Sequence, residues 1–366
     1  MSGNSFFQKL FSPLQGLLSV GQKTIVGVDI GTSAIKVCEL AVSKDKLKLL
    51  SFSSIPLSQG CILEDEIQKH EEVVSALKKA LSSAGVRSKH CAVGVFGPNT
   101  IAKRLQVEAG TPEEIENQVM WESEHYIPFE ALDSAVSHHV IGKNEGGGND
   151  VILAAARQDV INAFRELVTE AGLKVAIVDL SLFALNNIFE YTIQKNRDAY
   201  DDGTVVIDFG AQTTKLIVYK NKAPIFTREL SMGGAMITEE IQRQMGISFA
   251  EAEDLKTVGD ASGNLPEEVM QIIETSLETF FAELRKTLVF FLAAATDDKI
   301  HHCFITGGSA QIPGFAQGLE TLLEIKVNRM SPMDSVDYSR SKFSKEAVSF
   351  INNQGAVVLG LAMRQT

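Results

Sequence analysis

The sequence predicts an α/β fold in which two similar lobes each begin with a strand–turn–strand unit. Segments 25–37 and 205–217 share one pattern: an apolar run, Asp-x-Gly, small and hydroxyl-bearing residues, and a second β-prone run that contains a lysine. Such a pattern indicates a β-hairpin. A third segment, 304–314, runs from an apolar strand into Gly307-Gly308 and a helix start. A chain of 366 residues is long enough for two such lobes.

Both hairpins carry residues that suit phosphate groups. Gly31 and Gly210 let the turn backbone approach a ligand, and the neighbouring hydroxyls and amides can hold anionic oxygens. Asp29 and Asp208 cannot bind phosphate directly, because like charges repel, but each can hold a hydrated Mg²⁺ that phosphate also binds. The double glycine of the third segment would let a base or ribose lie against bare backbone.

Composition and charge limit the classes of partner. The net charge of −12 argues against nucleic acid or an anionic membrane bound through bulk electrostatics. The four cysteines are far apart and form no C-x-x-C, which favours reduced thiols in a cytosolic protein without structural zinc. No apolar run is long enough to cross a bilayer.

Residues 1–22 form an N-terminal tail for which two interpretations stay open. Apolar residues recur at roughly helical spacing within 1–18, with Pro13 between them. The segment either packs on this protein or a partner, or lies as an amphipathic helix on a membrane surface. Lys9 is the only basic residue in the first twenty, so attraction to lipid headgroups would be weak.

The first lobe is expected over 23–198. Strands are predicted at 25–30, 34–42 and 46–55, a helix at 66–84 that Gly85 closes, and another strand at 90–96. Strand 175–178 and helix 181–194 then return to this lobe.

An αβ insert is expected within the first lobe, over about 97–172. Thr111 and Pro112 read as the N-cap and first residue of a helix that runs to Tyr126. Strands at 134–142 and 150–157 and a helix at 159–171 follow. Trp121 and Tyr126 belong either to the core or to a partner-binding patch.

The second lobe is expected over 203–345. It opens with the second hairpin, continues with a strand at 224–232 and a helix-rich stretch, and reaches the third segment through a strand at 303–306. Within the last part, 346–366, the small apolar residues of 354–363 predict a helix that packs back on the first lobe.

In order and spacing, the three glycine-containing segments resemble the two phosphate loops and the adenosine loop of the actin-like ATPase superfamily. Residues 27–37, and Gly233-Gly234 followed by Ala252-Glu253-Asp-Leu-Lys256, are similar to segments of the PilM family of type IV pilus assembly proteins and of the related FtsA family. The insert lies where both families carry their extra subdomain, 1C. The resemblance covers about 23–366, and the chain length suits PilM better than the longer FtsA, which ends in a membrane helix.

The resemblance implies two lobes of ribonuclease-H-like topology with ATP and Mg²⁺ between them. It assigns the metal to Asp29 and Asp208 and the phosphates to both turns. The ribose hydroxyls go to Glu253 and Lys256, and the adenosine lies beside Gly307, Gly308 and Ser309. The implied nucleotide-binding residues are Gly31, Thr32, Ser33, Lys36, Gly210, Ala211, Thr213, Gly233, Gly234, Glu253, Lys256, Gly307, Gly308 and Ser309.

Three departures from the family pattern bear on activity. Ala211 and Gln212 replace consecutive glycines and limit how closely the second turn can approach phosphate. Asp179 is the only acid in the segment where a catalytic carboxylate is expected; if it points elsewhere, the protein binds ATP and hydrolyses it slowly. Lys215 stands where some relatives have an acid, and the sequence assigns it no role. Strand alternation also leaves the direction of Lys36 undetermined.

The resemblance implies a nucleotide-dependent scaffold at the cytoplasmic face of the inner membrane. Its partner would be the cytoplasmic N-terminal peptide of a PilN-like membrane protein, bound in a groove between the first lobe and the insert; contacts with other pilus platform proteins and self-association are compatible with it. The alternatives are an FtsA-like polymerising ATPase and a sugar or acetate kinase on the same fold.

Overall fold

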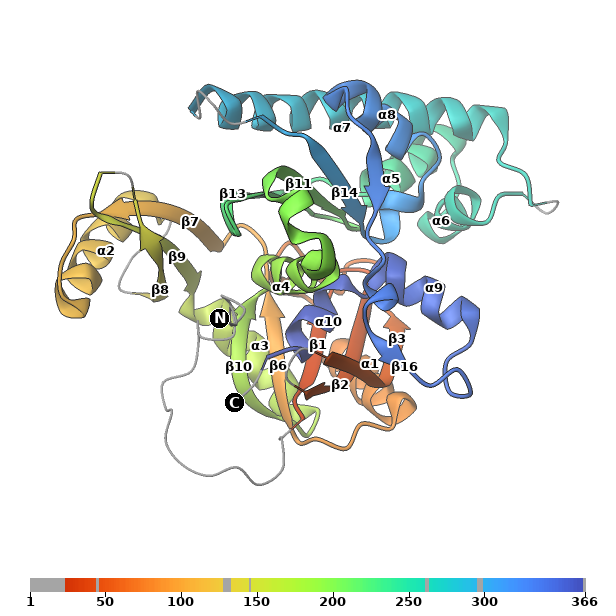
Figure 1. Ribbon diagram of the computed structural model, residues 1–366. Coiled ribbons are helices and arrows are strands. Elements are labelled where there is room, and N and C mark those ends of the chain that lie inside the picture. Colours follow the sequence, from red (N-terminus) through yellow and green to blue (C-terminus); the bar gives the residue numbers. More distant parts are fainter. Residues whose placement is uncertain are drawn as a thin grey trace.

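The computed structural model describes residues 24–43, 46–127, 133–144, 146–260, 263–294 and 299–364. The tail expected at 1–22 lies outside these residues. Two lobes, each built around a mixed sheet, lie against each other, and a smaller insert projects sideways from the first lobe (Figure 1). No helix within the described ranges combines the length and apolar character that a bilayer span requires.

The sheet of the first lobe has the strand order β10-β6-β1-β2-β3-β16. Its centre is β1, Val26–Ile30, in which every residue is buried, as expected for a strand covered on both faces. It pairs antiparallel with β2 and parallel with β6. The other strands are β2 (Ala34–Ser43), β3 (Lys46–Pro56), β6 (His90–Val95), β10 (Lys174–Leu180) and the short β16 (Asp337–Tyr338). The helices packed on this sheet include α1 (His70–Ala84), α3 (Gln158–Glu170) and α4 (Ser181–Ile193).

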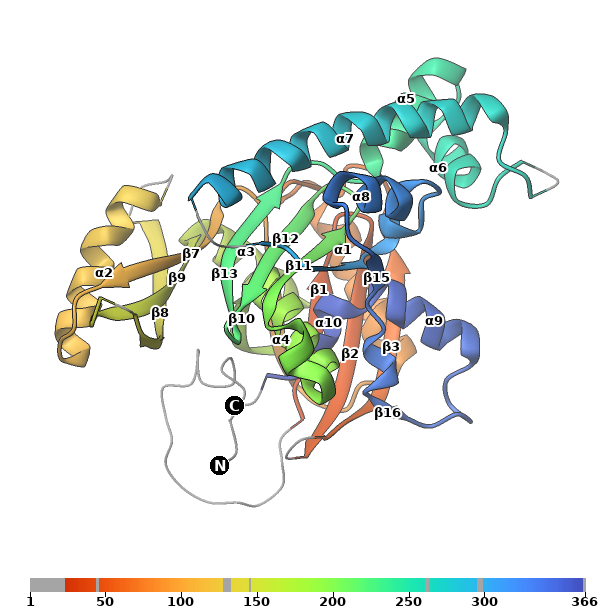
Figure 2. The same ribbon diagram turned by 45° about the horizontal axis from the view of Figure 1, so that its top comes forward.

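The second lobe repeats this topology. Its sheet has the order β13-β12-β11-β14-β15, with two antiparallel pairings on one side of β11 and parallel pairings on the other. The strands are β11 (Asp202–Phe209), β12 (Thr214–Lys220), β13 (Ala223–Leu230), β14 (His302–Thr306) and β15 (Val327–Arg329). The helices are α5 (Ala235–Met245), α6 (Phe249–Thr257), α7 (Glu267–Ala294) and α8 (Phe315–Leu323), and the long α7 lies across one face of the sheet (Figure 2). The predicted two-lobed fold of ribonuclease-H-like topology is confirmed.

The insert contains a three-stranded sheet of order β7-β9-β8 and one helix, α2 (Pro112–Tyr126). Thr111 and Glu114 form a capping box at the start of α2, so the predicted start of this helix is confirmed. The strands are β7 (Thr100–Val107), β8 (Ser134–Lys143) and β9 (Asn149–Arg157). The sequence analysis did not predict β7, because its polar and charged residues weaken the apolar alternation of a strand.

Helix α3, which the sequence analysis grouped with the insert, packs on the first lobe instead. Its buried side chains Phe164, Leu167 and Val168 belong to the core of that lobe, and the helix contacts β6, β10 and α1. The insert has a small core of its own, which contains Leu105, Val107, Ile115, Val119, Val151 and Leu153.

Two helix boundaries also differ from the prediction. The helix expected from residue 66 begins at His70, because residues 62–67 form a tight hairpin of β4 (Ile62–Leu63) and β5 (Glu66–Ile67). The helix expected over 354–363 is the shorter α10 (Ala356–Ala362), which Gly355 separates from α9 (Lys345–Gln354), a helix that the sequence analysis did not predict. Three short 3₁₀ helices complete the described elements: η3 (Gln194–Tyr200), η4 (Gly308–Gln311) and η5 (Pro332–Asp334).

Helix α10 returns to the first lobe, as predicted, and lies between β1 and α4. Small residues permit this close approach. A Cβ atom on Gly27 would lie 2.4 Å from the carbonyl oxygen of Val358, and one on Gly360 would lie 1.8 Å from that of Ala184. Helix α4 in turn contacts the second lobe, where the Phe189 ring lies 5.4 Å from Tyr219 and 5.6 Å from Phe304, centroid to centroid.

Candidate functional site

A cavity of about 690 Å³ lies between the lobes, where the turns of the two equivalent hairpins face each other. This volume is in the range of small-molecule sites. The residues that the sequence analysis placed at a nucleotide and that line this cavity are Asp29, Gly31, Thr32, Ser33, Lys36, Asp208, Gly210, Ala211, Thr213, Glu253, Lys256, Gly307, Gly308 and Ser309. Gly233, Gly234 and Asp179 do not line it.

The two turns have the same backbone geometry. The amide of Gly31 donates to the carbonyl of Ala34 over 3.1 Å, and that of Gly210 donates to the carbonyl of Thr213 over 3.0 Å. In each hairpin the Asp that precedes the glycine pairs across the strands with a lysine: Asp29 with Lys36 and Asp208 with Lys215. Cross-strand partners share one face of a sheet, so each lysine lies beside its carboxylate.

Both carboxylates form ion pairs with these lysines. Lys36 Nζ lies 3.4 Å from Asp29 Oδ2, and Lys215 Nζ lies 3.7 Å from Asp208 Oδ2. Burial disfavours the charged form of Lys215, but the carboxylates of Glu229, Asp208 and Asp29 more than offset it and raise the pKa of Lys215. Lys36 and Lys215 both line the cavity. The side chain of Lys36, whose direction strand alternation left undetermined, therefore points to the cavity.

The third predicted segment supplies a turn that only glycine fits. Gly307 has φ +99°, and a Cβ atom there would lie 2.3 Å from the carbonyl oxygen of Phe209 and 2.6 Å from Asp208 Oδ1. Gly307 thus brings the turn before η4 directly against the strand end that carries Asp208. Gly308 lies beside the side chain of Gln354, which also lines the cavity.

Gly233 and Gly234 support the second turn from behind and do not line the cavity. The amide of Gly234 donates to the carbonyl of Gly210 over 2.9 Å. A Cβ atom on Gly233 would lie 2.3 Å from the carbonyl oxygen of Ala211, and one on Gly234 would lie 2.1 Å from Ser309 Oγ. The two glycines let the start of α5 pack against the second hairpin turn and against the turn that carries Ser309. We therefore correct their expected role from ligand contact to support of these turns.

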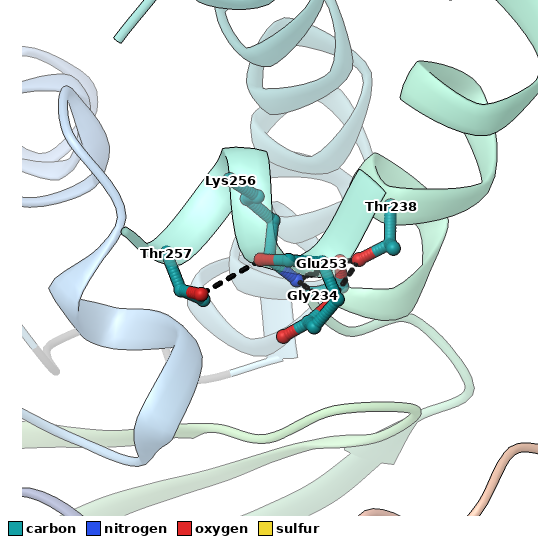
Figure 3. A network of polar contacts seen from close by, with 5 residues as sticks. All are labelled: Gly234, Thr238, Glu253, Lys256 and Thr257. Atoms are coloured by element: carbon teal, nitrogen blue, oxygen red, sulfur yellow. Dashed lines mark hydrogen bonds and ion pairs between the residues drawn. The ribbon is translucent and has the colours of Figure 1, made fainter. Parts of the chain in front are cut away.

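Glu253 and Lys256 lie on α6, beside Gly234 and Thr238 at the start of α5, but they differ in what they can offer a ligand (Figure 3). Lys256 Nζ donates three hydrogen bonds: 3.1 Å to the Gly234 carbonyl, 2.6 Å to Thr238 Oγ1 and 2.6 Å to Glu253 Oε2. Its side chain is 4% exposed, whereas that of Glu253 is 42% exposed. Burial lowers the pKa of Lys256, and the Glu253 carboxylate opposes this effect.

An ammonium group has only three donors, and these bonds occupy all of them. Lys256 is therefore a positioning residue that holds Glu253 against the mouth of the cavity. Of the two residues expected at the ribose, Glu253 alone keeps an oxygen available for a hydroxyl.

Asp179 is not placed for catalysis. It is 1% exposed at the end of β10 and forms a buried ion pair with Arg364, whose Nη2 lies 2.5 Å from Asp179 Oδ2. Burial raises the pKa of Asp179, against the lowering effect of the Arg364 charge. Its carboxylate points to the chain's C-terminal part and not into the cavity.

The donor set suits a hydrated Mg²⁺ better than a metal held by the protein alone. Among the described residues, no cluster of three or more His, Cys, Asp or Glu side chains could hold a metal ion. Asp29 and Asp208 both line the cavity, and Mg²⁺ is commonly held by one or two carboxylates together with water and substrate phosphates. The two carboxylates therefore fit an ion that arrives with a polyphosphate.

Two sets of contacts join the second turn to Gly97-Pro98-Asn99, the residues that lead from β6 into the insert and that we call the insert joint. Glu229, the β13 partner of Lys215, accepts a hydrogen bond from the Gly97 amide over 3.2 Å. Gln212 in the turn accepts from the Glu64 amide over 3.4 Å, and the adjacent Asp65 accepts from the Asn99 amide over 3.1 Å.

Sequence reasoning assigned no part in the site to several residues of the cavity wall, among them Phe96, Lys215, Gln311 and Gln354. One signal was present for Lys215. It occupies the same place relative to Asp208 that Lys36 occupies relative to Asp29, so the internal repeat alone predicts that both lysines face one site.

Solved structures and curated sequences of known proteins are similar to this chain. The structure of a PilM–PilN type IV pilus biogenesis complex aligns with a TM-score of 0.82 and 26% identity over 94% of this chain and 98% of that one. The ethanolamine utilization protein EutJ of Carboxydothermus hydrogenoformans shares the fold, with a TM-score of 0.57 and 14% identity over 98% and 93% of the two chains.

Curated relatives are cell division proteins. FtsA of Enterococcus faecalis is 24% identical over 84% of this chain and 78% of its own length, and FtsA of Escherichia coli is 23% identical over 90% of each. The family model described as type IV pilus assembly protein PilM matches residues 27–366. The chain therefore belongs to the PilM family of type IV pilus assembly proteins, which has the actin-like ATPase fold.

Proposed function

We propose that this chain is an ATP-binding scaffold of the type IV pilus inner-membrane platform, located at the cytoplasmic face of that membrane. In this proposal it binds the cytoplasmic N-terminal peptide of a PilN-like protein between the first lobe and the insert. The observation that carries the nucleotide part is the cavity itself, which both Asp-x-Gly turns and the Gly307-Gly308 turn line together.

The polyphosphate would lie between the turns at Gly31 and Gly210, where backbone amides and the hydroxyls of Thr32, Ser33 and Thr213 are available. Asp29 and Asp208 would hold Mg²⁺, which would offset phosphate charge when bound. Charged hydrogen bonds contribute roughly 1.5–3 kcal/mol each, so a few of them support micromolar affinity, about −8 kcal/mol.

Hydrolysis is proposed to be slow. The acids of the described residues that line the cavity are Asp29, Asp208 and Glu253. The first two pair with lysines and the third is held by Lys256. The two aspartates would hold Mg²⁺ and the remaining oxygen of Glu253 is assigned to the ribose, so no acid of the cavity wall is assigned to position water in line with a γ-phosphate, which phosphoryl transfer requires.

The partner part of the proposal is supported by the similar PilM–PilN complex. Binding to the cytoplasmic peptide of an inner-membrane protein would hold this chain at the cytoplasmic face of that membrane. Nucleotide and peptide would be coupled through the insert joint, because Glu229 and Asp65 both accept hydrogen bonds there. A ligand that moves the second turn would move the base of the insert.

Such coupling is reciprocal: the factor by which ATP tightens peptide binding must equal the factor by which the peptide tightens ATP binding. Calorimetric titrations of ATP with Mg²⁺ and of the N-terminal peptide of the PilN homologue from the same genome, each alone and with the other saturating, measure both factors. Equal factors above one are expected. Absence of ATP binding rejects the nucleotide part, absence of peptide binding rejects the partner part, and unequal factors reject the two-site model.

Polymerisation is the second candidate, because the FtsA relatives match most of the chain. Sedimentation with ATP and with ADP, combined with electron microscopy, tests it. Filaments that form only with nucleotide would favour this function over the scaffold.

A further inference from the structure

We propose that Lys215 is a fixed cation at the phosphate end of the cavity, which lets the site bind a nucleoside triphosphate without a divalent metal ion. Lys215 would contact the polyphosphate from the second lobe, and Lys36 would contact it from the first. This inference rests on the nucleotide binding proposed above, and it names the group of this chain that replaces part of the charge of Mg²⁺.

The first argument is symmetry. Lys36 and Lys215 lie at equivalent positions of equivalent hairpins, each directly across from the Asp at the end of the central strand. Both line the cavity, and their side chains are 13% and 10% exposed. A ligand that spans the space between the turns therefore meets one ammonium from each lobe.

The second argument is that the ammonium of Lys215 has donors to spare. Its nearest carboxylate oxygen, Asp208 Oδ2, is 3.7 Å away, too far for a hydrogen bond. Among the described residues, Asp208 is the nearest acceptor to Lys215 Nζ, and at this distance it holds the ammonium only weakly. Lys256, the other buried lysine of the cavity wall, uses all three of its donors inside the protein.

Burial without hydrogen bonds is costly for an ammonium group, so oxygens that enter the cavity would satisfy Lys215. Phosphate oxygens are suitable acceptors.

The third argument is charge balance. A polyphosphate that enters a cavity lined by Asp29 and Asp208 is repelled by both carboxylates unless cations lie between them. Lys36 and Lys215 offset two of the three carboxylates around them, Asp29, Asp208 and Glu229, and so reduce the repulsion that the polyphosphate meets. The Phe96 ring, 5.6 Å from Lys215 Nζ, lies beside the ammonium and helps to keep the group in place.

The test is calorimetric titration of ATP into the wild-type protein, once with Mg²⁺ and once with EDTA and no divalent ion. The affinity without metal is expected to stay within about tenfold of the affinity with Mg²⁺, a difference of one decade in Kd. Lys215→Met is expected to lose about 10- to 100-fold of the metal-free affinity, the range of a charged hydrogen bond, and less of the Mg²⁺-supported affinity.

Lys36→Met is the matched variant from the other lobe and is expected to lose metal-free affinity by a similar factor. Lys326→Met, at an exposed position outside the cavity wall, is the control and should change neither affinity. Thermal unfolding without ATP checks each fold, and Lys215→Gln serves as a second variant.

Strict dependence of the wild type on Mg²⁺ overturns the inference while nucleotide binding stands, and so does metal-free binding that Lys215→Met and Lys215→Gln leave unchanged. No ATP binding in either buffer overturns the proposed function itself. Strict dependence of the wild type on Mg²⁺ overturns the inference even if neither variant folds.

Discussion

Glu229 on β13 accepts a hydrogen bond from the backbone amide of Gly97, with 3.2 Å between Oε1 and the nitrogen. The bond joins the second lobe to the first residue of the insert joint. Glu229 also faces Lys215 across the β12–β13 pair. One side chain thus contacts both the wall of the cavity and the base of the insert.

Glu229→Ala is therefore expected to weaken the coupling between ATP and the PilN peptide. Couplings between sites are typically about 1–3 kcal/mol, and removal of this bond should bring the measured factor towards one. Each ligand should still bind when titrated alone.

Glu229→Gln keeps an oxygen that can accept from Gly97 and should restore much of the coupling. The same calorimetric titrations in both orders measure the effect. A coupling factor that Glu229→Ala leaves at the wild-type value excludes this contact as the link.

The repeated hairpins explain why the fold and most of the cavity wall could be predicted. An apolar run that ends in Asp-x-Gly is a local pattern, and local patterns place a strand and its turn without knowledge of the rest of the chain. The position of the C-terminal helix could be predicted for a similar reason, because small residues such as Gly360 indicate close packing.

Residues that depend on distant partners could not be predicted. The sequence indicates Asp179 as a candidate catalytic acid, but in the structure it is paired with Arg364, which is far along the chain. Lys256 reads as a ribose contact, yet its donors are taken by groups on α5. Strand β7 has too few apolar residues to be recognised and is held by its pairing with β9.

Asp208→Ala tests the metal site. The variant is expected to lose the gain in ATP affinity that Mg²⁺ provides, because a carboxylate that holds the hydrated ion is gone. The fold should persist, since the side chain faces the cavity. Titrations with and without Mg²⁺ measure the loss, and Asp202→Ala, at the exposed other end of β11, is the matched control. Undiminished Mg²⁺-dependent binding would remove Asp208 from the site.

Glu253→Gln and Lys256→Met test two different roles: contact with the ribose for Glu253, and positioning of Glu253 for Lys256. Glu253→Gln should reduce the preference for ATP over 2′-deoxy-ATP, because Glu253 keeps an oxygen for the ribose, while stability changes little. Lys256→Met removes the three hydrogen bonds of a buried ammonium group and should cost about 1–3 kcal/mol of unfolding free energy. Urea denaturation and competition between the two nucleotides are the measurements. An unchanged preference in Glu253→Gln would place the ribose elsewhere.

Asp179→Asn should destabilise the protein without slowing the chemical step. Removing one partner of a buried ion pair costs about 3–5 kcal/mol, because the other charge stays buried. The double variant Asp179→Leu with Arg364→Met should recover much of that loss. Phosphate release, compared at equal occupancy by ATP, should match the wild type. A large fall in that rate in a folded variant would return Asp179 to the list of catalytic candidates.

Glu190 predicts a pH dependence of stability. The side chain is 6% exposed on α4, where Asn186 Nδ2 donates to it over 2.8 Å and Arg197 Nη2 over 3.1 Å. Burial raises the pKa of Glu190 to about 7, against the lowering effects of Arg197 and Asn186.

The folded protein holds the proton of the Glu190 carboxyl more tightly than the unfolded chain does. The contribution of this carboxyl to the free energy of unfolding is therefore complete below its ordinary pKa of 4.5 and is lost as the pH rises to about 7. Each pKa unit corresponds to about 1.4 kcal/mol. Urea denaturation at several pH values between 4.5 and 8 should therefore show a fall in unfolding free energy that Glu190→Gln reduces. Glu274→Gln, exposed on α7, is the control and should keep the wild-type slope. If Glu190→Gln keeps that slope as well, another group causes the pH dependence.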